Sequence, residues 1–130
     1  MVEEYLTKEM INVGEFFVRK LDEHDLKPNA AFWLFMPESE KWKLVVAEAS
    51  VRTLGPKKIY EKIQQILGES PDAFRGLLSL EDVTLAKPDD PIIALLHAAI
   101  HTGPDISGIR FKNNVINGTF IEDAYIYRMN

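Results

Sequence analysis

The chain has 130 residues and a formal net charge of −5 at pH 7, with 46% hydrophobic and 27% charged residues. These values suit one soluble globular domain over residues 1–130 and argue against a disordered chain. The negative charge disfavours nucleic acid, and a sequence without cysteine excludes a disulfide scaffold and thiolate metal sites. No apolar run approaches the ~20 residues of a membrane span, and the N-terminus is acidic where a signal peptide is basic. We therefore expect a cytoplasmic protein with no membrane or nucleic-acid partner.

A first helix is predicted after Thr7, which can cap it. Apolar residues follow this cap at helical spacing, namely Met10, Val13, Phe17 and Leu21. The chain breaks at Lys27–Asn29, and two apolar runs fill residues 30–49 on either side of the turn Pro37–Lys41. This pattern predicts a β-hairpin.

The register of this hairpin follows from the length of its turn. With a five-residue turn, Leu34 faces Leu44 on one side of the hairpin, and Trp33 faces Val45 on the other. Both sides are apolar, so both need covering, either by helices on each side or by a helix and a second subunit. We expect Trp33 to be buried.

The middle of the chain predicts a second helix, a strand and a third helix. The second helix begins at Pro56 and ends near Gly68, because proline is favoured in a first turn and glycine at a helix end. A strand is expected at about Val83–Ala86. The third helix has Asp90 as its cap and an apolar body reaching Ile100, and we expect it to be mostly buried.

The last segment contains Asn117-Gly118, the sequence favoured in a two-residue hairpin turn. This turn fixes the register, so that Val115 faces Phe120 and Lys112 faces Asp123 as a charge pair. The predicted core side carries Ile109, Phe111, Val115, Phe120, Ala124 and Ile126. The other side mixes charged, aromatic and aliphatic residues as interfaces do, and carries Arg110, Lys112, Ile116, Ile121, Asp123, Tyr125 and Tyr127.

These elements predict an α+β protein with a largely antiparallel five-stranded sheet, built from two hairpins and one linking strand, and three main helices. Their order along the chain is helix, hairpin, helix, strand, helix, hairpin. The order of the strands within the sheet cannot be read from the sequence.

The run Ala31-Phe32-Trp33-Leu34, together with Trp42, Gly55-Pro56 and Tyr60, resembles a small prokaryotic family of uncharacterised α+β proteins. These are core and turn positions. The resemblance therefore implies a fold and carries over no active site.

His97 and His101 stand four residues apart on the third helix, a spacing that places both imidazoles on one face and occurs in many zinc sites. No glutamate follows His97 as in an HExxH motif, and a third ligand would have to come from a distant carboxylate. We interpret the pair as structural and expect no metal or other cofactor. Metal binding remains the alternative.

An anion is a second candidate ligand, because a glycine turn and basic residues meet at the start of the second helix. The residues concerned are Arg52, Gly55, Lys57 and Lys58. No phosphate-binding glycine motif is present, and proline in the first turn removes one donor. A capped helix with a solvated lysine face is the simpler interpretation.

Three functions stay open. The hypothesis we favour is a non-enzymatic, self-associating interaction module, a homodimer or a partner of another protein, with Ile116, Ile121, Tyr125 and Tyr127 at the contact. A metal-dependent hydrolase or nuclease using His97 and His101 is the first alternative, although no ExK element or nucleophile elbow accompanies it. A small anionic-ligand binder at Gly55–Lys58 is the second.

Overall fold

The computed structural model of the protein describes residues 5–47, 54–71, 74 and 76–130. Within them, three helices and a five-stranded, mostly antiparallel sheet form an α+β fold, which confirms the predicted class and order of elements. The helices are α1 (Lys8–Glu23), α3 (Pro56–Gly68) and α4 (Pro91–Ala99), and a 3-10 turn, η2, spans Leu80–Asp82. The strands are β1 (Ala30–Met36), β2 (Lys41–Ala47), β3 (Val83–Ala86), β4 (Ile109–Ile116) and β5 (Thr119–Met129).

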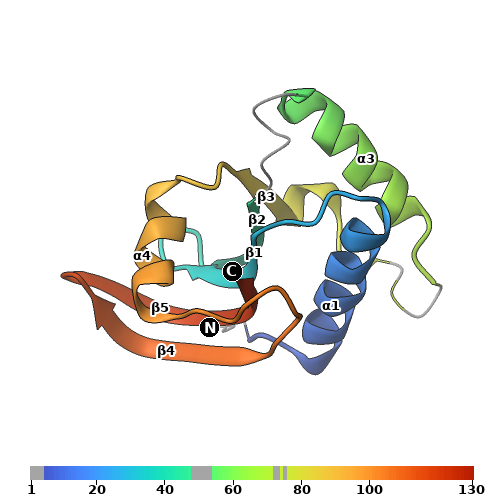
Figure 1. The fold of residues 1–130 in the computed structure, drawn as a ribbon. Coiled ribbons are helices and arrows are strands. Elements are labelled where there is room, and N and C mark those ends of the chain that lie inside the picture. The colour runs from blue at the N-terminus through green and yellow to red at the C-terminus, as the bar shows by residue number, and fades with distance from the viewer. Residues whose placement is uncertain (1–4, 48–53, 72–73, 75) are drawn as a thin grey trace.

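The strand order is β3-β2-β1-β5-β4, which places the two hairpins side by side with β1 at the centre (Figure 1). β2 and β3 run parallel, and the other pairs are antiparallel. The linking strand β3 lies at one edge of the described sheet and β4 at the other. This order was not available from the sequence, because the pairing of β1 with β5 joins segments far apart in the chain.

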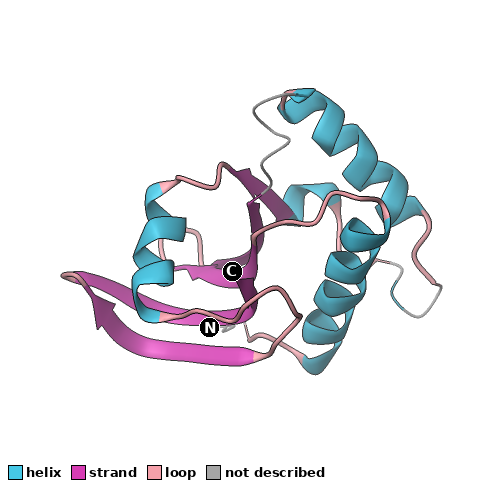
Figure 2. Ribbon diagram, in the orientation of Figure 1, coloured by secondary structure: helices cyan, strands magenta, loops and turns pink. Residues whose placement is uncertain are grey.

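Helices of the same chain cover both faces of the first hairpin. α1 and α3 lie on one face of the sheet and α4 on the other (Figure 2). The α1/α3 core includes Val13, Phe17, Leu21, Trp33, Leu44, Ile63 and Tyr127. The α4 core includes Phe32, Val45, Ile93, Leu96, Ile116, Ile121 and Ile126. Covering β1 and β2 therefore needs no second subunit, which removes one argument for a dimer.

α4 is less buried than predicted. Its cap is as expected, since the Asp90 side chain accepts a hydrogen bond from the Ile92 amide at 3.1 Å. Ile93 and Leu96 are buried against the sheet, whereas Ala94 and most of the last turn are exposed. α4 has nine residues and packs against the sheet on one side only, so it buries a single row of side chains. Its apolar sequence therefore did not imply burial on all sides.

The ends of α1 follow local backbone chemistry. Thr7 accepts a hydrogen bond from the Met10 amide at 3.1 Å, as its position before the apolar stripe predicted. The helix ends without a glycine, because Asp25 itself adopts the left-handed conformation (φ 61°) and the Leu26 amide reaches back to the Leu21 carbonyl at 3.0 Å. This turn ends α1 and leads into β1.

The register of the first hairpin differs by one residue from the prediction. Trp33 pairs with Leu44, where Val45 was expected. The turn is one residue shorter because Glu40 adopts a left-handed conformation (φ 54°), a role that sequence patterns normally assign to glycine or asparagine. A shift of one residue moves every side chain of a strand to the other face. Leu44 therefore lies in the α1/α3 core and Val45 in the α4 core.

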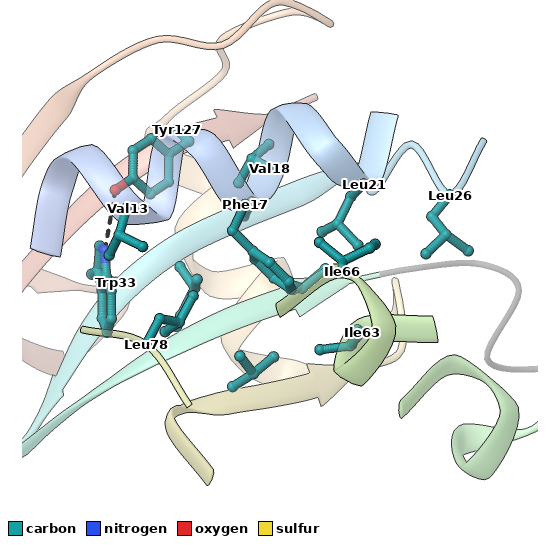
Figure 3. Close-up of a cluster of buried hydrophobic side chains, with 14 of the residues drawn as sticks. Val13, Phe17, Val18, Leu21, Leu26, Trp33, Ile63, Ile66, Leu78 and Tyr127 are labelled. Carbon is teal, nitrogen blue, oxygen red and sulfur yellow. Dashed lines mark hydrogen bonds between the residues drawn. The ribbon is translucent and has the colours of Figure 1, made fainter. Parts of the chain in front are cut away.

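Trp33 is buried, as predicted, beneath α1. Its indole Nε1 donates to the Tyr127 hydroxyl at 3.1 Å (Figure 3). That hydroxyl donates in turn to the Ile11 carbonyl at 2.6 Å. Gly14 faces this pair from the helix, where a side chain would collide with both rings. Burial raises the pKa of Tyr127 above its usual range, and the hydrogen bond from Trp33 acts in the opposite direction.

Candidate functional site

The four residues predicted to form an interface do not share an exposed face. Ile116 and Ile121 are buried in the α4 core, while Tyr127 is buried and Tyr125 partly buried on the α1/α3 side of the sheet. The predicted row is therefore wrong as a single surface. These side chains stabilise the fold from both sides of β5.

The change of side has a local cause at Asn113. The register of the hairpin is as predicted, with Val115 opposite Phe120 and Lys112 opposite Asp123. However, Asn113 has a positive φ of 51°, and the alternation of faces is broken around it. Asparagine tolerates this conformation better than most residues, so Asn113 was the one sequence feature able to reveal the break.

Val115 and Phe120, predicted to be core residues, are instead the accessible apolar side chains of this hairpin. They are 64% and 56% exposed and lie directly opposite each other next to the turn. This end of the β4–β5 hairpin extends past α4 (Figure 1). The molecule thus presents an apolar pair on a regular, hydrogen-bonded support, which we call the hairpin-tip pair.

The charge pair of the hairpin differs from the predicted one. Asp123 is buried and accepts two hydrogen bonds from Arg110, at 2.6 Å from Nε and 2.6 Å from Nη2. Lys112, although it is the cross-strand neighbour of Asp123, is exposed. The guanidinium fits a carboxylate with two parallel bonds, which the ammonium of Lys112 cannot do.

A cleft of about 660 Å³ lies between α1, the entry to β1 and the end of β5. Its cationic lining comes from Arg19, Lys27 and Arg128, and its acidic lining includes Asp22. Arg128 is buried and binds Asp22 through two bonds of 3.0 and 2.8 Å; it also donates to the Pro28 carbonyl at 3.0 Å. Its Nε is buried without a hydrogen-bond partner among the described residues. Local sequence patterns held no sign of this cluster, because Asp22 and Arg128 lie 106 positions apart in the chain.

His97 and His101 do meet. The Nε2 atom of His97 lies 3.2 Å from the Nδ1 atom of His101, and the rings stand edge to face with centroids 5.1 Å apart. Both side chains are exposed. The two rings lie together as predicted, but not on one helix face, because α4 ends at Ala99 and His101 lies beyond it. No group of three His, Cys, Asp or Glu able to hold a metal ion occurs in the described part of the chain.

The predicted anion site at the start of α3 is described in part. Gly55 has a φ of 86° and precedes Pro56, and the side chains of Lys57 and Lys58 are exposed on the first turn. Arg52 lies outside the described residues. The described members form an open helix start with lysines facing solvent, so the simpler interpretation fits them.

Comparisons of the chain with protein-family models, curated proteins and solved structures give no match. The resemblance to a prokaryotic family therefore stays a prediction. Among the helices in the described ranges, none has the length and apolar character needed to cross a membrane. Any function must be argued from the hairpin-tip pair, the Arg128 cleft and the two histidines.

Proposed function

We propose that this protein is a non-enzymatic interaction module that self-associates through the hairpin-tip pair. The observation that supports the proposal is the exposure of Val115 and Phe120 on one side of a rigid hairpin. Exposed large apolar side chains that lie together favour a protein contact. Scattered single ones do not.

We expect the two copies to meet through the face of the β4–β5 hairpin and not through its edge. β4 is an edge strand, and Arg110 and Lys112 are exposed along it. Charged side chains on an edge strand oppose pairing with another strand. The face formed by Val115 and Phe120 carries no such charge at either position, so two copies can pack these residues against each other about a two-fold axis.

The expected association is weak. An interface centred on two side chains lies at the small end of specific protein contacts. Removing an aromatic and a β-branched residue from water still contributes a few kcal/mol, about 1.5–3 for each fully buried side chain. We therefore expect a reversible dimer with a dissociation constant on the order of 0.1–1 mM.

Sedimentation velocity from about 1 to 500 µM tests this proposal. The wild-type chain should shift from monomer to dimer, and the double variant Val115→Ser, Phe120→Ser should stay monomeric with an unchanged melting temperature, because both residues are exposed. Leu54→Ser is the matched control, since Leu54 is another exposed large apolar residue away from the hairpin. A monomeric wild type, or an equal effect of Leu54→Ser, contradicts the proposal.

A second candidate function is the binding of a small anion in the Arg128 cleft. It is favoured by the cationic side chains of Arg19, Lys27 and Arg128 around a volume typical of ligand sites, which span about 300–1,000 Å³. Against it stands Asp22, which already neutralises Arg128.

Thermal denaturation with inorganic phosphate or a dicarboxylate distinguishes this cleft from the start of α3. Binding raises the melting temperature in proportion to RT ln(1 + [L]/Kd). If the cleft binds the anion, Arg19→Gln plus Lys27→Gln removes the rise, whereas Lys57→Gln plus Lys58→Gln keeps it. The reverse pattern would assign the anion to the start of α3.

A further inference from the structure

We propose that His97 and His101 form a chelating site for a divalent transition-metal ion of the class that prefers imidazole ligands, Zn²⁺, Ni²⁺ or Cu²⁺. This site is independent of the hairpin-tip pair. His97 Nε2 and His101 Nδ1 lie 3.2 Å apart and share a hydrogen bond, and this separation carries the inference, because an ion would take the place of the shared proton. Two nitrogens each about 2.0–2.1 Å from a zinc ion lie about 3.3–3.4 Å apart at a tetrahedral angle and about 2.9 Å apart at a right angle. The observed distance falls between these values.

The backbone that carries the two histidines is anchored on both sides. His97 belongs to the last turn of α4, next to the buried Leu96. His101 lies between Ile100, which is buried, and Thr102, whose amide donates to the Met129 carbonyl at 2.9 Å. Because the backbone of His101 is fixed on both sides although the helix has already ended, little backbone freedom is lost when an ion binds.

The hydroxyl of Thr102 adds a second tie to β5. It accepts a hydrogen bond from the Met129 amide at 2.8 Å and donates to the Gly103 carbonyl at 2.9 Å. Thr102 therefore both donates to Met129 and accepts from it, and these two hydrogen bonds attach the segment that carries His101 to the end of β5. The fold therefore fixes the backbone that carries His101.

The site offers two protein ligands, fewer than the three or four of catalytic and structural zinc sites. In the described part of the chain no third His, Cys, Asp or Glu joins them. Water or a small solute therefore completes the coordination, and the ion exchanges readily. By the usual order of affinities for nitrogen ligands, Cu²⁺ binds more tightly than Ni²⁺ or Zn²⁺.

Calorimetric titration of chelator-treated protein, prepared without a histidine tag, with Cu²⁺, Ni²⁺ and Zn²⁺ tests the proposal. We expect one ion per chain, and at least about a tenfold loss of affinity in His97→Gln and in His101→Gln, a loss of the size that removal of one ligand of a chelate produces. His24→Gln is the matched control, because His24 is the one histidine of the sequence outside the pair. Its Nε2 lies 3.5 Å from a Glu69 carboxylate oxygen.

The absorption band of bound Cu²⁺ provides a second measurement of binding, independent of calorimetry. It should appear in the wild type and in His24→Gln and be lost in His97→Gln plus His101→Gln, while circular dichroism stays unchanged because both histidines are exposed. Binding to the double variant as tight as to the wild type overturns the proposal. One ion per two chains would overturn the single-chain site and indicate a bridge between copies.

Discussion

Replacement of Gly14 by alanine tests how closely α1 packs against the sheet. Gly14 is buried in the middle of α1, a position where glycine is normally unfavourable. An added Cβ would lie 2.7 Å from Trp33 Nε1 and 2.8 Å from Tyr127 Cζ, and closer still to the Tyr127 hydroxyl. Both rings are only 1% exposed, so neither can move aside without disturbing the core.

The magnitude is set by opposing effects. Alanine stabilises a helix interior by about 0.5–1 kcal/mol relative to glycine. Overpacking a tight core costs about 1–3 kcal/mol. Displacing Tyr127 also breaks the hydrogen-bond chain from Trp33 to the Ile11 carbonyl, and a buried donor left unpaired costs about 1–3 kcal/mol. We expect Gly14→Ala to lower the free energy of unfolding by about 3 kcal/mol and the melting temperature by roughly 10 °C.

Urea denaturation and calorimetry of Gly14→Ala beside Gly68→Ala measure this effect. Gly68 is the last residue of α3, and no described atom lies within 4 Å of a Cβ placed there. Gly68→Ala should leave stability unchanged or raise it by up to about 1 kcal/mol. If Gly14→Ala matches or exceeds the stability of the wild type, the close approach of α1 to Trp33 and Tyr127 is refuted.

Three further predictions concern charged and titrating groups. Because burial raises the pKa of Tyr127, the folded state retains a proton that the unfolded chain releases, so stability should fall as the pH rises above about 10, and Tyr127→Phe should weaken this fall in urea denaturation. Arg128→Ala leaves Asp22 without its bidentate partner and should cost about 2–4 kcal/mol of unfolding free energy, measured in the same way. Arg110→Ala should cost about 1 kcal/mol, whereas Lys112→Ala should change stability by less than about 0.5 kcal/mol.

Each of these three predictions has a control variant or a control measurement. Arg19→Ala removes an exposed ion pair to Glu15 and should be nearly neutral, so an equal loss in Arg19→Ala and Arg128→Ala would argue against the buried pair. A larger loss from Lys112→Ala than from Arg110→Ala would restore the cross-strand pair with Asp123 predicted from the sequence. If the free energy of unfolding falls equally with pH in the wild type and in Tyr127→Phe, Tyr127 is not the group that causes the fall.

Local patterns predicted the elements well, because the features that start and stop them act over a few residues. Thr7 and Asp90 cap their helices through bonds to residues two or three positions ahead, and Asn117-Gly118 fixed the register of the second hairpin. The first hairpin was misjudged by one residue. Its turn relies on a left-handed Glu40, which composition does not reveal.

The candidate sites were predicted less well than the fold. The meeting of His97 and His101 was foreseen, but not for the expected reason, because α4 ends at Ala99 and His101 follows an extended Ile100 outside the helix. Their distance was not foreseen. Burial of Ile116, Ile121 and Tyr127 depends on which helix covers which part of the sheet. The break of alternation at Asn113 exposes Val115 and Phe120, which the alternating pattern placed in the core.

By itself, the sequence determined the α+β class, the starts of the helices and the turn at Asn117-Gly118, because caps, prolines and apolar periodicity act between neighbours in the chain. The tertiary structure alone decided that β1 pairs with β5, that α4 covers one face while α1 and α3 cover the other, and that Arg128 reaches Asp22. These are contacts between distant segments. They are selected by the joint burial of both faces of one sheet, a condition on the whole chain that no local stretch of residues encodes.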